Sequence, residues 1–218
     1  MKYKCLVFDH DDTVVNSTAT IHHPCFQDFL DIYRPGMKCT LEKYFMSNFH
    51  PGFIQICREE YGLSDEELRE ETQFWLSFVK GHIPEAYEGM GEIMRRHRAE
   101  GGLICVVSHS FEENILRDYK ANGLPEPDAV FGWGRPVEQR KPYPYPLQEI
   151  MRIYGLEPGE LLMIDDLKPG YDMAKSCGVD FAAVGWANDV AGIESFMRAN
   201  CSLYFKTVGD LSDFLFNC

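Results

Sequence analysis

The chain has 218 residues, of which 45% are hydrophobic and 25% charged, so it is long enough to bury a full apolar core and has an ordinary globular composition. Its formal net charge of −13 argues against a nucleic-acid partner, which requires a basic face, and more weakly against binding to an anionic membrane. No apolar run approaches the length of a membrane span and no basic-then-apolar leader opens the chain, so we expect no membrane segment and no signal peptide.

The eight cysteines are scattered along the chain and form neither a C-x-x-C pair nor a zinc-binding spacing. Several lie inside apolar runs, where a free cysteine behaves as a small hydrophobic residue. This usage predicts a reducing, cytoplasmic setting.

The first predicted element is a buried strand that begins near Lys4 and ends at Phe8, because its residues are apolar and rich in strand formers. Three carboxylates follow within four residues, at Asp9, Asp11 and Asp12. Clustered anions raise one another's pKa, and a hard divalent cation with oxygen ligands is an economical way to hold them ionised. The alternative is a polar exit from the strand whose aspartates only cap a turn.

Residues 18–82 contain four predicted helices and no predicted strand. Apolar residues recur there at helical spacing, and Ser64 followed by acids and Glu67 has the pattern of a capping box. Pro and Gly residues separate the segments. The predicted helices are 22–34, 40–49, 51–61 and 64–80.

From Glu85 onward, predicted strands and helices alternate, which indicates a parallel sheet with helices on both faces. The helical block 18–82 lies between the first and second strands and is therefore an insertion. Ligands bind at the carboxyl ends of such strands, so we expect the polar residues that follow three of them to converge. The predicted strands after the first are 103–107, 129–133, 161–164, 181–184 and 202–205; the helices are 89–99, one ending near 123, 145–154, one ending near 178, one near 190–199 and one at the C-terminus.

Four motifs in this order make the chain resemble the haloacid dehalogenase superfamily, and specifically its phosphatase-like members with a helical cap inserted after the first motif. The motifs are Asp9-x-Asp11-x-Thr13, Ser108 after a hydrophobic strand, Lys141-Pro142, and Asp165-Asp166-x-x-x-Gly170. The resemblance covers essentially the whole chain. It implies an α/β fold with a Rossmann-like three-layer core and parallel sheet formed by residues 1–17 and 83–218, and an all-helical cap domain at residues 18–82.

The resemblance also assigns catalytic roles. Asp9 would attack phosphorus and form an aspartyl phosphate, which divides a slow hydrolysis into two easier steps. Asp11 would act as the general acid that protonates the leaving oxygen and later activates water. The dehalogenases that give the superfamily its name lack an acid two places after the nucleophile, so Asp11 favours phosphoryl chemistry.

Mg²⁺ is the cofactor that the resemblance implies. Its ligands would be Asp9, the backbone carbonyl of Asp11, and Asp166, with Asp165 as an outer or auxiliary ligand. Asp12 stands where most relatives have Gly; Asp tolerates left-handed backbone geometry better than most residues, so we expect the turn to survive with an added charge beside the metal.

The substrate phosphate would be bound by Ser108, His109 and Lys141. Ser108 and backbone N–H groups near His109 would donate to the phosphoryl group, and Lys141 would neutralise its charge. The alternative for Lys141 is an exposed loop lysine. The alternative for the His109 side chain is a hydrogen bond within its own loop. In the cap, His22 and His23 are the best candidates for substrate contacts, against the alternative that both are ordinary helix-surface or hinge residues.

We therefore expect a Mg²⁺-dependent phosphatase whose partner is a small phosphorylated metabolite. One alternative is a sugar-phosphate mutase resembling β-phosphoglucomutase, which uses the same core and a similar cap. The other is a non-catalytic relative that binds a phosphorylated ligand. The presence of every motif residue disfavours this second alternative.

Overall fold

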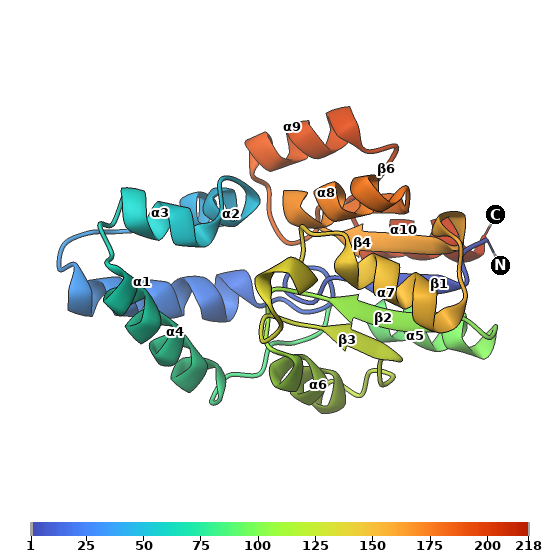
Figure 1. The fold of residues 1–218 in the computed structure, drawn as a ribbon, viewed down its shortest axis with the longest axis horizontal. Coiled ribbons are helices and arrows are strands. Elements are labelled where there is room, and N and C mark those ends of the chain that lie inside the picture. Colours follow the sequence, from blue (N-terminus) through green and yellow to red (C-terminus); the bar gives the residue numbers. More distant parts are fainter. Residues whose placement is uncertain (1, 218) are drawn as a thin grey trace. The chain divides into compact units, whose positions relative to one another are not determined.

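The computed structural model describes residues 2–217 (Figure 1). The described chain divides into two compact units, of which Ser17–Pro84 is one and the remaining residues are the other. The second of these contains the whole sheet, and Ser17–Pro84 is helical. None of the helices in residues 2–217 combines the length and the apolar composition that crossing a membrane requires.

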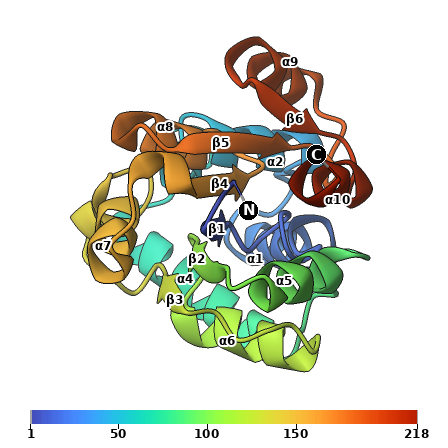
Figure 2. The ribbon, with the colours of Figure 1, turned by 90° about the vertical axis from the view of Figure 1, so that its right-hand side faces the viewer.

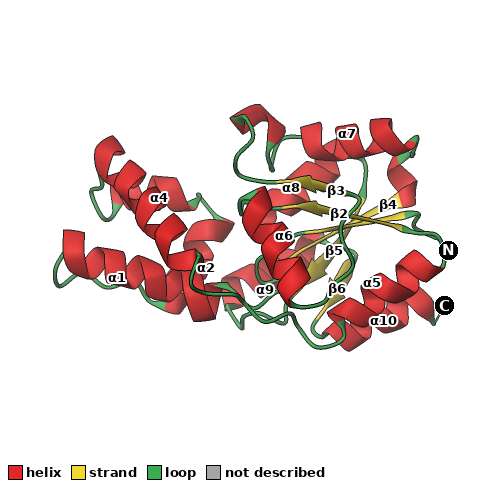
Figure 3. Ribbon diagram, turned by 90° about the horizontal axis from the view of Figure 1, so that it is seen from below, coloured by secondary structure: helices red, strands yellow, loops and turns green. Residues whose placement is uncertain are grey.

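The sheet has six parallel strands in the order β3-β2-β1-β4-β5-β6. In β1, β2 and β4 nearly every residue is buried, because helices cover both faces of the sheet. Figure 2 shows α7 and α8 on one face and α5 and α10 on the other, and Figure 3 shows the strands between these layers. This architecture confirms the predicted α/β three-layer core. The strands are β1 Cys5–Phe8, β2 Leu103–Val107, β3 Ala129–Phe131, β4 Leu161–Asp165, β5 Asp180–Val184 and β6 Leu203–Phe205.

The helices of the sheet-containing unit lead the chain back to the start of the next strand, except for α10, which follows the last strand. They are α5 Met90–Ala99, α6 Glu112–Ala121, α7 Tyr145–Tyr154, α8 Lys168–Cys177, α9 Ala191–Asn200 and α10 Val208–Phe216, with short 3₁₀ turns at Val137–Gln139 and Pro158–Glu160.

The strand order brings β1 to the centre of the sheet, between β2 and β4. Leu6 of β1 is paired with Ile104 on one side and with Leu162 on the other. The chain goes from β1 to β2 and β3 in one direction and then to β4, β5 and β6 in the other, so the topological switch point lies between β1 and β4. Open parallel sheets bind their ligands at the carboxyl ends of strands at this point.

The helical unit has its own core. A short π-helical turn, η1 Thr18–His22, precedes α1 His23–Tyr33, so the first predicted helix starts with an irregular turn. The predicted capping box is confirmed at the start of α4, where Glu67 N donates to Ser64 Oγ at 3.2 Å and Ser64 N donates to Glu67 Oε2 at 2.8 Å. The other helices are α2 Leu41–Phe49, α3 Phe53–Glu59 and α4 Asp65–Val79, and the core includes Phe26, Phe29, Leu30, Tyr61 and Leu68.

A carboxyl group, that of Glu71 in α4, lies inside this helical unit, and the residue is only 7% exposed. After burial, the charge of Glu71 is a further cause that raises the pKa of the thiols of Cys25 and Cys57. Burial raises the pKa of Glu71 to about 7, and the nearby His22 opposes the rise. The carboxyl group is therefore easier to bury with its proton than without it.

We expect Glu71→Gln to stabilise the protein at pH 8. The folded state keeps this proton up to about pH 7, whereas the unfolded state loses it near the ordinary value of 4.5, so wild-type stability falls as pH rises between these values. The gain in the free energy of unfolding should be about 3 kcal/mol at pH 8 and below about 1 kcal/mol at pH 5. Urea denaturation at both pH values measures it.

Glu67→Gln is the matched control, because Arg34 binds the Glu67 carboxylate at 2.7 and 2.8 Å and lowers its pKa to about 2. This substitution should destabilise the protein equally at pH 5 and pH 8, since Glu67 is ionised at both. A Glu71→Gln effect that does not change with pH would contradict the raised pKa.

Candidate active site

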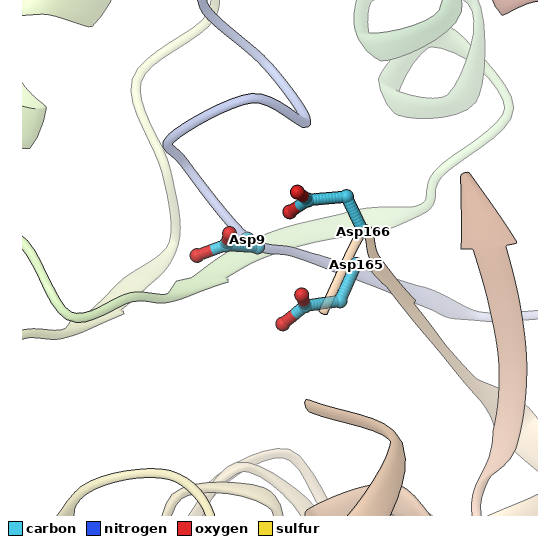
Figure 4. Close-up of side chains that lie close together, drawn as sticks. All are labelled: Asp9, Asp165 and Asp166. Atoms are coloured by element: carbon cyan, nitrogen blue, oxygen red, sulfur yellow. The ribbon is translucent and has the colours of Figure 1, made fainter. Parts of the chain in front are cut away.

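Three buried carboxylates meet at the carboxyl ends of β1 and β4 (Figure 4). Asp9 follows β1, and Asp165 and Asp166 stand at the end of β4; each offers one oxygen, and these oxygens lie within 4.8 Å of one another. The two strands bring them together because Phe8 is paired with Ile164, and Asp9 N donates to the Ile164 carbonyl at 2.9 Å. Asp9 is more than 150 positions away from Asp165 and Asp166 in the sequence, and the three residues come together at the switch point of the sheet.

Lys141 brings a positive charge to this group. Its Nζ lies 2.7 Å from Asp9 Oδ1 and 2.8 Å from Asp165 Oδ2, and the residue is only 5% exposed. Burial acts to lower the pKa of Lys141, but the two carboxylates outweigh it and raise the pKa above its usual value. The alternative of an exposed loop lysine is therefore wrong, and Lys141 is a fixed cation inside the site.

One lysine does not neutralise three carboxylates. Burial raises the pKa of Asp9 to about 7, and the charges of Asp165 and Asp11 add to this rise against the opposing effect of Lys141. Burial also raises the pKa of Asp166 well above its ordinary range, with the charges of Asp12 and Asp165 as further causes. The site therefore has an excess of negative charge that a cation would relieve.

The donor set fits a hard divalent cation. Among residues 2–217, Asp166 Oδ2 is buried and has no hydrogen-bond partner, although unpaired buried oxygens are costly. The other oxygen, Oδ1, lies 3.4 Å from Thr13 Oγ1. All three converging side chains offer carboxylate oxygens, which are the ligands that Mg²⁺ prefers.

Gly170 explains the spacing of the fourth motif. A Cβ atom on this glycine, which lies in the first turn of α8, would come within 2.1 Å of Asp165 Oδ2. The glycine therefore lets the helix approach the carboxylate closely. At the start of the same helix, Leu167 N donates to Asp165 Oδ1 at 2.8 Å. Asp165 is thus held by the backbone on one oxygen and by Lys141 on the other.

The Asp11 side chain is directed to the loop after β2. Ser110 Oγ donates to Asp11 Oδ2 at 2.6 Å, Ser108 Oγ lies 3.5 Å from the same oxygen, and Ser110 N donates to Ser108 Oγ at 3.1 Å. The Asp11 carboxylate is not one of the three converging groups, and the role of its backbone carbonyl as a ligand stays a prediction. Ser110 was not among the predicted site residues, although the alternation of Ser108 and Ser110 immediately after a buried strand is a signal for it.

Asp12 adopts the left-handed backbone conformation that its position predicts, with φ of +61°. Its N–H donates to the Val15 carbonyl at 2.7 Å, which closes the turn after the first motif. The side chain is 3% exposed, and its charge is the second cause of the raised pKa of Asp166. The turn therefore accommodates Asp in place of Gly, at the expense of more negative charge in the site.

The His109 side chain forms a hydrogen bond with the backbone of the loop that carries Lys141. Its ring Nε2 lies 2.9 Å from the Lys141 carbonyl oxygen, so the ring N–H donates to that carbonyl, and the ring edge contacts Trp133. The predicted alternative, a hydrogen bond within its own loop, is therefore wrong, because the acceptor lies in the loop that carries Lys141. The imidazole holds the backbone that carries Lys141, and a phosphate contact by His109 stays a prediction for its backbone N–H.

His22 and His23 each use one ring nitrogen inside the helical unit. Trp75 Nε1 donates to His22 Nδ1 at 2.9 Å, and His23 Nε2 lies 2.7 Å from the Cys39 carbonyl oxygen. The bond from Trp75 makes Nδ1 of His22 an acceptor and so leaves its proton on Nε2. Contact of these rings with a substrate stays a prediction.

Residues 6–184 match the family model described as haloacid dehalogenase-like hydrolase. Pyrophosphatase PpaX of Halalkalibacterium halodurans is 24% identical over 216 residues, which cover 98% of this chain and 97% of that protein.

Two solved structures share the fold. A haloacid dehalogenase-like family hydrolase from Streptococcus pneumoniae matches with a TM-score of 0.76 at 15% identity and covers 98% of this chain and 99% of that one. CbbY from Rhodobacter sphaeroides, solved in complex with phosphate, matches with a TM-score of 0.72 at 16% identity, and 96% of each chain is covered.

Proposed function

The chain belongs to the haloacid dehalogenase-like hydrolase family and is therefore a hydrolase, and from this premise we propose that it is a Mg²⁺-dependent phosphatase of small phosphorylated metabolites that works through an aspartyl phosphate. Membership confirms the resemblance that the four motifs predict. The observation that carries the proposal is the Asp9 carboxylate, which lies 2.7 Å from the Lys141 ammonium inside a buried group of three carboxylates.

Asp9 is the proposed nucleophile. It stands at the carboxyl end of the central strand, and its backbone N–H bond to Ile164 gives the residue a fixed position. The carboxylate would attack phosphorus, and the bond from phosphorus to the leaving oxygen would break as the acyl phosphate forms. Lys141 is already held beside Asp9 and Asp165, so it would neutralise charge on the transferring group without a change of conformation.

Asp11 is the proposed general acid and base. Its carboxylate contacts Ser108 and Ser110 and is not one of the three converging groups, so it would not be needed as a ligand of the cation. In the first step Asp11 would give its proton to the leaving oxygen. In the second it would take a proton from the water that attacks the aspartyl phosphate, which restores Asp9 and releases phosphate.

Asp9, Asp166 and the backbone carbonyl of Asp11 would hold Mg²⁺, with Asp165 as an auxiliary group. When bound, the ion supplies positive charge that screens the approach of an anionic phosphate to a carboxylate. The raised pKa of Asp9 and of Asp166 supports this assignment, because protonation is the other way in which the site can relieve its charge.

The helical unit, Ser17–Pro84, is the proposed cap. It is inserted between β1 and β2, directly after the loop that carries Asp9 and Asp11. A cap that meets only the part of the substrate beyond the phosphate would govern selectivity, while the sheet-containing unit governs the chemistry. His22 and His23 remain its proposed substrate contacts.

Water is the proposed phosphoryl acceptor. The likeness over nearly the whole chain to a protein named as a pyrophosphatase supports hydrolysis over transfer to a second sugar hydroxyl. The two outcomes differ in their products, since a phosphatase releases inorganic phosphate and a mutase returns an isomerised ester.

The test is a panel of small phosphate esters, with pyrophosphate and an aryl phosphate included, assayed for free phosphate and for isomerised product. We expect release of phosphate that requires Mg²⁺, stops in EDTA and returns when Mg²⁺ is added in excess. Phosphate release that is unaffected by EDTA would contradict the metal dependence. Isomerised product without free phosphate would establish a mutase instead.

A further inference from the structure

His10, which lies between the proposed nucleophile and the proposed acid in the sequence, is buried, and its side chain contacts α6. Its ring Nε2 lies 3.2 Å from Asp118 Oδ2 of α6, and the two residues are only 1% and 3% exposed. The ring is also stacked against Tyr119, with the ring centroids 5.9 Å apart. A histidine N–H therefore ties the loop after β1 to a helix that carries none of the proposed catalytic groups.

Asp118 is itself held from its other side. Arg117 Nε lies 2.8 Å and Arg117 Nη2 lies 2.7 Å from Asp118 Oδ1. One oxygen of the carboxylate thus binds the guanidinium and the other receives the His10 N–H. Both oxygens have a donor, so the carboxylate offers His10 a fixed acceptor.

The polar cluster around His10 lowers the stability of the folded protein, because several of its buried atoms lack a hydrogen bond. Within residues 2–217, His10 Nδ1, Asn114 Nδ2 and Tyr119 Oη are buried and have no hydrogen-bond partner. Each buried, unpaired polar atom costs about 1–3 kcal/mol. Apolar side chains at positions 10 and 118 together would avoid part of this cost, so packing alone does not account for the pair.

The three consecutive side chains of the loop are held by three different parts of the sheet-containing unit. Asp9 contacts Lys141 at 2.7 Å, His10 contacts Asp118 of α6 at 3.2 Å, and Asp11 accepts from Ser110 at 2.6 Å. The His10 bond therefore resists rotation of the loop about its own axis. Such a rotation would move the carboxylates of Asp9 and Asp11 together.

We propose that His10 is a positioning residue which, through its bond to Asp118, holds the Asp9 and Asp11 carboxylates in the geometry for phosphoryl transfer. The inference rests on the proposed function, because it takes these two residues as nucleophile and acid. His10 touches no reacting atom. Its loss should slow the chemistry and weaken metal binding while the protein keeps its fold.

The experiment compares His10→Leu and His10→Gln. Leucine fills the buried space without a donor, whereas the glutamine amide N–H can reach the Asp118 carboxylate. We expect His10→Leu to lower kcat on an aryl phosphate by about 10- to 100-fold with KM changed by less than about threefold, because small misplacements of catalytic groups have effects of this size. His10→Gln should restore kcat to within about threefold of wild type. The melting temperature of His10→Leu should fall by only a few degrees, because Asp118 Oδ2 loses its donor while Oδ1 keeps the bonds from Arg117.

Two further variants supply a control and complete a double-mutant cycle. Tyr119→Phe removes an unpaired hydroxyl from the same cluster without touching the His10 bond, and it should leave kcat unchanged. Asp118→Leu should lower kcat as His10→Leu does, and the double variant should be no slower than either single one, because both break the same bond. Losses that multiply in the double variant would overturn the inference.

Calorimetric titration with Mg²⁺ alone separates this inference from the proposed function. His10→Leu should bind Mg²⁺ several-fold more weakly than wild type, and His10→Gln should bind it as wild type does. A wild-type protein that hydrolyses no phosphate would overturn the proposed function, while the titration would still test the role of His10. Equal Mg²⁺ affinity and equal kcat in wild type and His10→Leu would show that His10 has no positioning role.

Discussion

Replacing Asp9 with asparagine is expected to lower kcat by at least about 10³-fold on every substrate, including an activated aryl phosphate. An amide has almost the same shape as a carboxylate but cannot attack phosphorus to form the acyl phosphate. Because Asp9 is buried and its pKa is raised to about 7, losing its charge costs no stability at neutral pH, and the variant should stay folded. Phosphate release, the melting temperature and labelling of the protein by a radioactive ester measure the outcome.

Asp213→Asn is the matched control, since it makes the same chemical change on the exposed surface of α10 and should leave kcat unchanged. Labelled Asp9→Asn protein, or turnover near the wild-type value, would rule out Asp9 as the nucleophile. The mechanism would then have to start from a different carboxylate of the site.

Replacing Asp11 with asparagine is expected to separate the two steps. An aryl phosphate with a good leaving group needs little help from an acid, so the aspartyl phosphate on Asp9 should still form. Its hydrolysis needs a base to activate water, and kcat should fall by about 10²- to 10⁴-fold. Rapid quenching with a labelled aryl phosphate should therefore show a covalent phosphoenzyme that accumulates in Asp11→Asn and stays low in wild type.

Ser110→Ala is the companion variant. It removes the hydroxyl that donates to Asp11 Oδ2 at 2.6 Å but keeps the carboxylate itself. We expect slower turnover than in wild type and no accumulation of phosphoenzyme, because the base is still present. If Asp11→Asn formed no covalent species and turned over near the wild-type rate, another group would have to be the base.

The proposed chemistry requires two carboxylates with different roles only two residues apart, and their surroundings separate them. Asp9 is held beside Lys141 in the buried anionic group, where the cation would keep it ionised. Asp11 lies among hydroxyl groups from the loop after β2. Groups of the same kind take acid and nucleophile roles when their environments differ in this way.

The sequence by itself determined the class of fold and the order of its elements. Apolar runs alternate with helical patterns from residue 85 onward, and this alternation specifies a parallel sheet because both faces of such strands must be buried. The four motifs were readable for a related reason. Each consists of polar residues that interrupt an apolar strand or a helix start, where a local pattern is enough to reveal them.

The left-handed turn at Asp12 was also predictable, because a backbone conformation depends mainly on the residue and its neighbours. The capping box at Ser64 and Glu67 is local in the same sense, since both partners lie within one helical turn. Interactions that close within a few residues leave a signature in the sequence.

Only the tertiary structure decided which partner each side chain takes. Lys141 could have been an exposed loop lysine, and only the fold brings it to Asp9 and Asp165. The contacts of Ser110 with Asp11 and of His10 with Asp118 were not predicted, because the partners are about 100 positions apart in the sequence. These contacts depend on strand order and helix docking, for which no short stretch of sequence carries a signal. Burial then raises the pKa of Asp9, and burial is a property of the whole fold.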